Sequence, residues 1–147
     1  MSCFDDAPAA PAEPKPLRLV VAGVMVDGDG RVLIQQRPAD KSFPHHWEFP
    51  GGKIEPNETP EAALVRELQE ELGIDTKESC LAPALFASHG YDSFHLLMPV
   101  FILRQWRGIP RPITSQQLRW LPLSGLDALE NLLPADRPLL PLLRQWL

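Results

Sequence analysis

The segment that restricts the fold of this sequence most is residues 51–74, GGKIEPNETPEAALVRELQEELGI. Thr59 offers a side-chain oxygen that can cap a helix. Pro60 suits the first helical position, where its missing N–H costs nothing. Gly73 is typical of the residue that follows the last turn of a helix. The segment therefore predicts one helix between these signals.

This predicted helix has an apolar stripe and a neighbouring acidic face, because successive side chains lie about 100° apart. The stripe consists of Leu64, Val65, Leu68 and Leu72. The acidic face holds Glu67, Glu70 and Glu71, whose like charges repel by roughly 0.2–0.5 kcal/mol per pair. Two interpretations are open. Either the face is solvated, with Arg66 pairing with Glu70, or the carboxylates bind a hard divalent cation, which prefers oxygen ligands.

The rest of the chain alternates strand-like and helical segments. Buried strands are expected in LRLVVAGVMV and RVLIQQR, and the turn sequence at residues 27–30 is predicted to join them as a hairpin. Further strands are expected in HHWEF, CLAPALFASH, SFHLLMPVFILRQW and LRWLP, and further helices in SGLDALENLL and RPLLPLLRQWL. This order predicts an α/β or α+β fold in which helices cover a mixed β-sheet.

Composition indicates one domain and excludes several kinds of partner. The 147 residues, 44% of them hydrophobic, suit a single globular domain over residues 17–147, after a flexible Pro- and Ala-rich leader over residues 1–16. A formal charge of −5 argues against binding to duplex nucleic acid, and no apolar run is long enough for a membrane helix. Because the cysteines are Cys3 and Cys80, a reducing, cytoplasmic location is expected. No feature of the sequence indicates an oligomeric state.

The spacing of residues around the acidic helix resembles the Nudix box of the Nudix hydrolases. Its specified positions are matched by Gly52, Glu58, Arg66-Glu67-Leu68, Glu70-Glu71 and Gly73-Ile74. The segments LIQQRPADKS, WEFPGGKIEP and LPADRPLL extend the resemblance to the MutT type of nucleoside triphosphate pyrophosphohydrolase. The resemblance implies a Nudix fold, which is an α/β/α sandwich around a mixed β-sheet. It also implies hydrolysis of a nucleoside triphosphate to the monophosphate and pyrophosphate, with Mg²⁺ or Mn²⁺ as cofactor.

By this resemblance, the acidic helix holds the metal. Glu67, Glu70 and Glu71 match the metal-ligand acids of the family, and the carbonyl of Gly51 matches a further ligand. Charge balance leads to the same expectation. A triphosphate brings about four negative charges to an acidic site, so it needs divalent ions in order to bind there. The expected partner is therefore a small nucleotide.

Neighbouring residues are expected to support the acids. Arg66 is expected to anchor them by hydrogen bonds, with a contact to substrate as the alternative, and Glu58 is expected to anchor the loop. Lys53 lies beside the glycines, where it either reaches a phosphate or extends into solvent. Thr114 departs from the family pattern, because MutT-type enzymes often carry a glutamate there as a metal ligand or base. Either the helix acids suffice, or water completes the ligands of the metal.

A second group of residues matches the positions that surround the nucleobase in the MutT type. It consists of Arg37, Phe49 and Asp136. Each has an alternative role: Arg37 as a solvated strand end, Phe49 as a core residue and Asp136 as the cap of the last helix. An ionised Asp136 accepts hydrogen bonds and cannot donate them, which favours an exocyclic amine such as that of cytosine. Recognition of 8-oxoguanine then requires a protonated Asp136 or contacts through the N–H groups of the base.

The resemblance favours an enzyme that hydrolyses oxidised or modified nucleotides, with 8-oxo-dGTP ahead of CTP or modified dCTP. Such an enzyme would sanitise the nucleotide pool and so serve DNA replication and repair. Two other classes stay open. One is a hydrolase of dinucleoside polyphosphates, for which Tyr91 lies at a typical distance after the box. The other is a non-catalytic Nudix module, which is disfavoured because the box retains its carboxylates.

Overall fold

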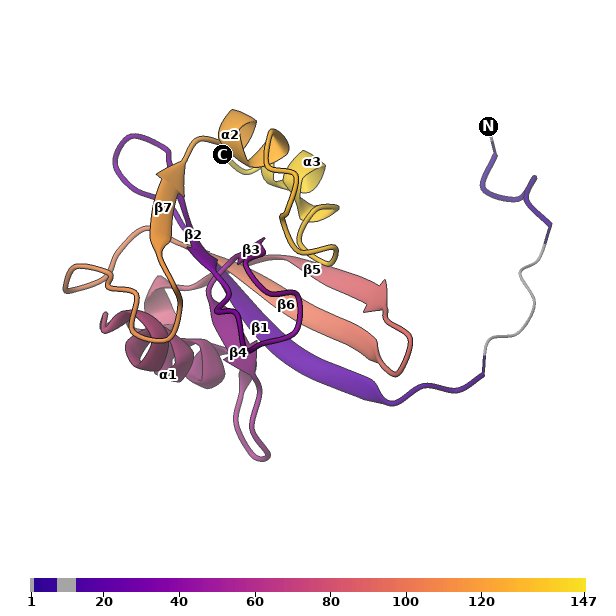
Figure 1. The fold of residues 1–147 in the computed structure, drawn as a ribbon, viewed down its shortest axis with the longest axis horizontal. Coiled ribbons are helices and arrows are strands. Elements are labelled where there is room, and N and C mark those ends of the chain that lie inside the picture. Colours follow the sequence, from indigo (N-terminus) through magenta and orange to yellow (C-terminus); the bar gives the residue numbers. More distant parts are fainter. Residues whose placement is uncertain (1, 8–12) are drawn as a thin grey trace.

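The computed structural model describes residues 2–7 and 13–147, and these form two β-sheets with three α-helices around them (Figure 1). The elements are β1 (Leu17–Met25), β2 (Val32–Gln36), β3 (Trp47–Glu48), β4 (Gly51–Lys53), α1 (Pro60–Leu72), the 3-10 turn η1 (Glu78–Cys80), β5 (Ala82–Gly90), β6 (His95–Leu103), β7 (Leu118–Leu121), α2 (Leu123–Asp127) and α3 (Leu139–Leu143). Residues 1 and 8–12 of the expected leader lie outside the described residues. None of the helices in the described part of the chain has both the length and the apolar character that crossing a membrane requires.

The strands form the mixed sheet that the sequence predicts and a second, antiparallel sheet beside it. In the four-stranded sheet, whose order is β4-β1-β6-β5, β1 runs parallel to β6 and antiparallel to β4. The three-stranded sheet has the order β3-β2-β7 and is antiparallel throughout. The pairing of β1 with β4 sets Gly51 opposite Ala22 and Gly52 opposite Val21. The two glycines at the start of β4 are therefore held against β1, an inner strand of the mixed sheet.

The prediction that the turn at residues 27–30 joins two paired strands is only partly correct. The turn forms, but the strands on either side of it do not stay paired. The turn itself forms, with the N–H of Gly30 donating to the carbonyl of Asp27 over 3.1 Å. A bridge between Val26 and Val32 follows, and the two strands then enter different sheets. The cause is that β2 is buried on both faces. Leu33 packs in the cluster that contains α1, whereas Val32 packs in the other cluster, so β2 does not depend on β1 for burial.

Helix α1 begins and ends where the sequence predicts. Thr59 Oγ1 accepts a hydrogen bond from the N–H of Ala62 over 3.1 Å, and Gly73 takes a left-handed φ of 70°. The buried residues of the helix are Ala63, Leu64, Leu68 and Leu72, with Val65 partly buried beside them. Leu64 lies so close to Gly23 of β1 that a Cβ at Gly23 would be 3.3 Å from Leu64 Cδ1. The apolar stripe is thus the surface that attaches α1 to the mixed sheet.

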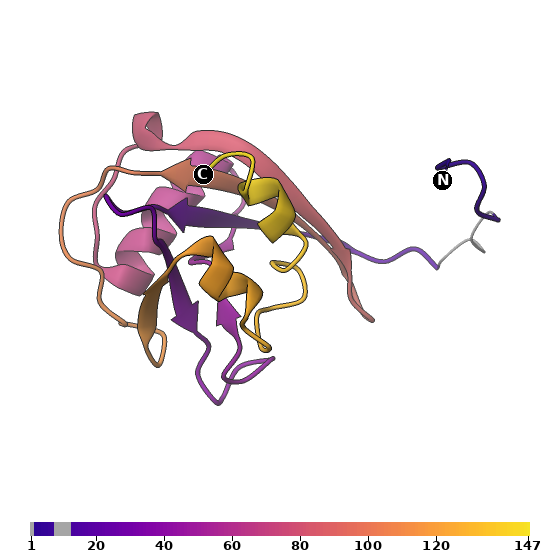
Figure 2. The same ribbon diagram turned by 90° about the horizontal axis from the view of Figure 1, so that it is seen from above.

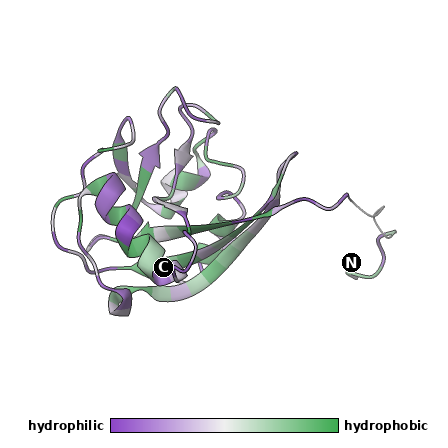
Figure 3. Ribbon diagram, turned by 90° about the horizontal axis from the view of Figure 1, so that it is seen from below, coloured by the Kyte–Doolittle hydropathy of each residue, from purple (hydrophilic) through white to green (hydrophobic). Residues whose placement is uncertain are grey.

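The core has two parts, because the mixed sheet carries buried side chains on both faces. One part lies between the sheet and α1 and contains Val21 and Met25. The other contains Val24 of β1, Ile34 of β2 and Leu139 of α3. Figure 1 shows α1 on one side of the strands and the short helices on the other, and Figure 2 shows α2 and α3 lying over the strands. Hydrophobic residues follow the long strands (Figure 3). This is the α/β/α arrangement expected of the fold.

Leu64→Ala is expected to lower the free energy of unfolding by about 2–5 kcal/mol, because Leu64 is fully buried between α1 and the mixed sheet. Urea unfolding followed by circular dichroism measures the change. Leu142→Ala is the matched control, since Leu142 is 45% exposed and its truncation is expected to cost less than about 1 kcal/mol. Equal losses in the two variants would contradict the packing of α1 against Gly23.

Candidate active site

A cavity of about 820 Å³ lies between the mixed sheet and the loops after β2 and before β7. Its wall includes Glu67 and Glu71 of α1 beside residues 51–52 of β4. The wall also includes Phe49, which follows β3, and Asp136, which precedes α3. A volume of this size suits a small-molecule ligand. The cavity therefore brings together helix acids and base-binding candidates that are far apart in the sequence.

Gly51 and Gly52 of β4 approach their neighbours too closely for any side chain. A Cβ at Gly51 would lie 1.9 Å from the carbonyl oxygen of Val21. A Cβ at Gly52 would lie 2.4 Å from the carboxyl carbon of Glu67. Because glycine has no Cβ, the backbone here can lie directly against a carboxylate of the helix.

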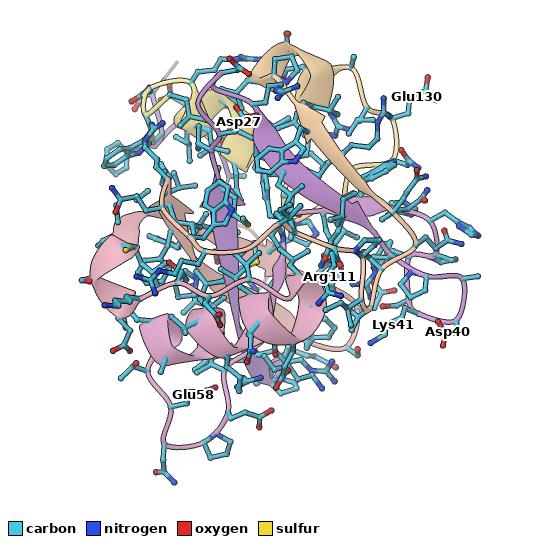
Figure 4. All side chains as sticks on the ribbon, turned by 90° about the vertical axis from the view of Figure 1, so that its left-hand side faces the viewer. Asp27, Asp40, Lys41, Glu58, Arg111 and Glu130 are labelled. Atoms are coloured by element: carbon cyan, nitrogen blue, oxygen red, sulfur yellow. The ribbon has the colours of Figure 1, made fainter. Side chains whose placement is uncertain are left out.

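Arg66 holds several acids of the site together. Its guanidinium donates two hydrogen bonds of 2.8 Å to Glu58, in the loop that leads into α1 (Figure 4). These hydrogen bonds hold the pKa of Glu58 at about 2. Arg66 also donates to Glu67 Oε1 over 2.9 Å, to Glu70 Oε2 over 3.3 Å and to the carbonyl of Lys53 over 3.1 Å. Arg66 therefore ties the loop after β4 to the helix acids.

The helix acids do not share one environment. The side chain of Glu70 is 57% exposed, and Glu70 lies outside the cavity wall. The side chain of Glu67 is 14% exposed, and burial raises its pKa. Glu71 lies closer to the protein interior, where burial is the main cause of its raised pKa. The three acids lie on the expected face of α1, which turns from solvent at Glu70 to the protein interior at Glu71.

Glu71 is held in the interior by neutral hydrogen-bond donors. Its Oε2 accepts a hydrogen bond from Gln35 Nε2 over 2.9 Å and another from the backbone N–H of Gly51 over 3.2 Å. Burial, together with the charges of Glu48 and Glu67, raises the pKa of Glu71 to about 8. The ionised form of this carboxyl therefore needs a further positive partner.

The carboxylates that face the cavity fit a hard divalent cation. Among the described residues, no group of three acidic, histidine or cysteine side chains already forms a metal cluster. Glu71 uses Oε2 for both of its hydrogen bonds, so its Oε1 remains available as a ligand atom. Glu67 lies against Gly52, where no side chain stands between carboxylate and backbone. Buried carboxylates that repel one another gain from a cation placed between them, and such cations prefer oxygen ligands.

Another part of the wall is built around Asp136. This residue is 3% exposed, and its Oδ2 accepts a hydrogen bond from the backbone N–H of Phe49 over 3.1 Å. Burial, aided by the charge of Glu48, raises the pKa of Asp136 to about 8, which favours the protonated carboxyl. The alternative role as a helix cap is wrong, because α3 begins at Leu139 without a side-chain cap. Phe49 belongs both to the core and to the cavity wall.

Arg37, Lys53 and Thr114 all lie in the cavity wall, but their contacts differ. Arg37 donates to Glu48 Oε2 over 3.0 Å and to the carbonyl of Ser42 over 2.7 Å. It therefore braces β3 and the loop after β2, and the alternative of a solvated strand end is wrong. Lys53 and Thr114 are exposed, and Thr114 supplies no carboxylate to the wall.

Aromatic rings form a further part of the wall. The ring centroids of Phe43 and Tyr91 are 5.8 Å apart, and those of Tyr91 and Phe94 are 4.9 Å apart. The guanidinium of Arg18 lies over the ring of Phe94, 4.2 Å from its centroid. All four residues line the cavity. Flat apolar surfaces of this kind suit the face of a nucleobase.

Sequence reasoning missed Gln35, Glu48 and Ser115 as members of the wall. Gln35 and Glu48 face each other across the pairing of β2 with β3. Gln35 Oε1 and Ser115 Oγ are buried without a hydrogen-bond partner among the described residues. A polar residue in the apolar run of β2 was the available signal for Gln35. The position of Glu48 depends on strand register, which has no local signal.

Comparison with known proteins agrees with this geometry. A family model described as NUDIX domain matches residues 16–143. The chain belongs to the Nudix family. A CTP pyrophosphohydrolase from Escherichia coli K12 is 51% identical over 123 residues, covering 82% of this chain and 87% of that protein. An 8-oxo-dGTP diphosphatase from the same organism is 35% identical over 126 residues, covering 86% of this chain and 95% of that protein.

A solved structure shares the fold. The solution structure of the E. coli ORF135 protein matches with a TM-score of 0.77 and 30% sequence identity, covering 92% of this chain and 94% of that one. The family match and the named relatives together make this chain a Nudix hydrolase, an enzyme that cleaves phosphoric anhydride bonds. The Nudix fold expected from the sequence is confirmed.

Asp136→Asn is expected to become more stable relative to the wild type as the pH rises from about 5 to about 8. The folded carboxyl keeps its proton up to about pH 8, whereas in the unfolded chain it ionises at about pH 4. The wild-type protein therefore loses stability across this range, with a slope that approaches about 1.4 kcal/mol per pH unit from this one group. Urea unfolding of both proteins at several pH values measures the difference.

Asp40→Asn is the matched control, because Asp40 is exposed on the loop after β2 (Figure 4). Its difference from the wild type is expected to stay constant across the same pH range. If Asp136→Asn behaves in the same way, the carboxyl of Asp136 is ionised in the folded protein.

Proposed function

We propose that this Nudix hydrolase is a metal-dependent nucleoside triphosphate pyrophosphohydrolase that removes oxidised nucleotides such as 8-oxo-dGTP from the nucleotide pool. The products would be the monophosphate and pyrophosphate. The observation that carries the proposal is that one cavity joins the carboxylates Glu67 and Glu71 to the aromatic and hydrogen-bonding groups around Asp136. The first surface suits a metal-bound triphosphate, and the second suits a nucleobase. The relative named 8-oxo-dGTP diphosphatase supports this choice.

Asp136 supports a base that needs both a donor and an acceptor. With a pKa of about 8, its carboxyl is neutral at pH 7, and a neutral carboxyl can donate as well as accept. The edge of 8-oxoguanine presents N–H groups and carbonyl oxygens, so a neutral Asp136 can form paired hydrogen bonds with it. The neighbouring rings of Phe49 and Tyr91 offer stacking surfaces for the same base.

The helix acids would hold the metal. The ligands would be Glu67, Glu70, Glu71 and the carbonyl of Gly51. A bound Mg²⁺ or Mn²⁺ ion supplies charge neutralisation for the phosphates and lowers the pKa of a bound water. Arg66 orients the carboxylates of Glu67 and Glu70 through its hydrogen bonds. Lys53 presents a positive charge at the cavity wall for a phosphate.

Hydrolysis of cytosine nucleotides is the second candidate function. The observation that favours it is the 51% identity to a CTP pyrophosphohydrolase. A neutral Asp136 can also pair with cytosine, which presents an amine donor and a ring-nitrogen acceptor. Hydrolysis of 8-oxo-dGTP or of modified dCTP would sanitise the nucleotide pool in the cytoplasm and so support DNA replication and repair.

Glu67→Gln is expected to lower metal-dependent kcat by at least about 100-fold, because it keeps the shape of the side chain and removes the charge that a cation needs. A pyrophosphate-release assay with and without Mg²⁺ measures the loss. Glu61→Gln is the matched control, since Glu61 lies in the first turn of α1 and outside the cavity wall. Wild-type turnover in Glu67→Gln would sink the metal-site assignment. A wild-type protein without metal-dependent turnover on any nucleotide would indicate a non-catalytic Nudix module.

The wild-type enzyme is expected to prefer 8-oxo-dGTP over dGTP by at least about 100-fold in kcat/KM, on the order of 2.7 kcal/mol. The measurement is pyrophosphate release with Mg²⁺ on 8-oxo-dGTP, dGTP, CTP, 5-methyl-dCTP and a dinucleoside polyphosphate. A higher kcat/KM for the cytosine nucleotides would select the second candidate. Preference for the dinucleoside polyphosphate would contradict both.

A further inference from the structure

Gln35 is a buried polar residue near the end of β2. It is 3% exposed and follows the fully buried residues Val32, Leu33 and Ile34. Its side chain lies in the cavity wall, and its Oε1 has no hydrogen-bond partner among the described residues. A buried polar atom without a partner destabilises the fold. An apolar residue would therefore suit this position of the strand better, unless the amide serves the site.

The side chain of Gln35 neighbours two acids of the cavity. Its Nε2 donates to Glu71 Oε2 over 2.9 Å. Gln35 also lies directly opposite Glu48 in the pairing of β2 with β3, so the two side chains project from the same face. Burial raises the pKa of Glu48, and the charge of Arg37 and its hydrogen bond to Glu48 oppose this rise. Gln35 therefore neighbours both Glu71, one of the proposed metal ligands, and Glu48, whose charge acts on Asp136.

We propose that Gln35 is a positioning residue for the metal site, holding the carboxylate of Glu71 so that Oε2 faces the protein and Oε1 faces the cation. This inference rests on the proposed metal-dependent function. Both donors to Glu71, Gln35 Nε2 and Gly51 N, reach the same oxygen, which fixes the direction of the carboxylate. Hydrogen bonds that orient a ligand in this way raise its affinity for a metal.

The neutrality of the amide is essential to this role. Arg66 brings a full positive charge to Glu67 over 2.9 Å and so competes with a cation for that carboxylate. An amide carries no charge, so it orients Glu71 without adding a positive charge that competes with a cation. Glu71 is therefore the helix acid that is both fixed in direction and uncompensated by an arginine contact among the described residues.

Gln35→Met tests the inference, because methionine has a similar length and lacks the amide donor. Mn²⁺ binding to the free protein is measured from the electron paramagnetic resonance signal of unbound Mn²⁺, and kcat and KM are measured at a fixed Mn²⁺ concentration. Mn²⁺ binding is expected to weaken by at least about tenfold and kcat to fall by a similar factor. KM for the nucleotide is expected to stay within about threefold, because the contacts around Asp136 are retained.

Gln36→Met is the matched control. It makes the same change one residue later, where the amide donates to the carbonyl of His45 over 3.1 Å and lies outside the cavity wall. A second measurement uses the wild-type protein and so does not depend on how a variant folds. In ¹⁵N–¹H NMR spectra, the side-chain amide signal of Gln35 is expected to shift as Mg²⁺ is added. The shift is expected to reach its maximum at the Mg²⁺ concentration that saturates turnover, while the signal of Gln36 stays in place.

Two results would overturn the inference and leave the proposed function intact. One is wild-type Mn²⁺ affinity in Gln35→Met, and the other is an unmoved Gln35 amide signal at a Mg²⁺ concentration that saturates turnover. If the wild-type protein itself neither binds Mn²⁺ nor shows metal-dependent turnover, the proposed function fails, and the inference fails with it.

Discussion

The close contact between Gly51 and Gly52 of β4 and helix α1 is the constraint on which the site depends. Strand β4 pairs with β1, and the N–H of Gly23 in β1 donates to the carbonyl of Pro50 over 2.9 Å. The two glycines are therefore fixed to an inner strand of the mixed sheet. Helix α1 is fixed to the same sheet by its apolar stripe. Because neither glycine has a Cβ, the carboxylate of Glu67 can lie against the backbone. The packing of β4 and α1 against the mixed sheet thus sets the acidic part of the cavity. A methyl group at Gly51 would clash with the backbone of β1, and one at Gly52 would clash with the carboxylate of Glu67.

Burial of like charges shapes the rest of the cavity, and the protein compensates those charges unevenly. The arginine pairs are Arg66 with Glu58, Glu67 and Glu70, and Arg37 with Glu48. Glu71 and Asp136 accept hydrogen bonds from neutral donors instead, and burial raises the pKa of each to about 8. Burial therefore raises the pKa of both carboxyl groups, but the two suit different partners. A cation favours the ionised form of Glu71, whereas a nucleobase can use the proton that Asp136 retains.

How far the structure could be predicted from the sequence depends on how locally each feature is specified. Helix α1 could be predicted, because Thr59 and Gly73 are local signals and the apolar period continues between them. Glu67 and Glu71, which line the cavity, were expected from the family pattern, whereas Glu48 was not. The separation of β1 from β2 could not be predicted, because the same turn residues also suit a hairpin whose strands stay paired. The contact of Asp136 with Phe49, 87 residues apart, and that of Gln35 with Glu71, 36 residues apart, depend on register and packing across the whole chain.

The loop before β7 limits which groups can act on a substrate. Thr114 lies in the cavity wall, where the family resemblance leads one to expect a glutamate, and it cannot serve as an anionic ligand or base. The carboxyl groups of the wall, among the described residues, belong to Glu48, Glu55, Glu67, Glu71 and Asp136. Glu48 is paired with an arginine, Glu55 is exposed in the loop after β4, and burial raises the pKa of Asp136 to about 8, which favours its protonated form. In the proposed reaction, the binding of the ion and the orientation of water therefore fall to the helix acids. A site that depends on so few carboxylates needs each of them well oriented, which gives the hydrogen bond from Gln35 to Glu71 more weight than it would have beside a loop glutamate.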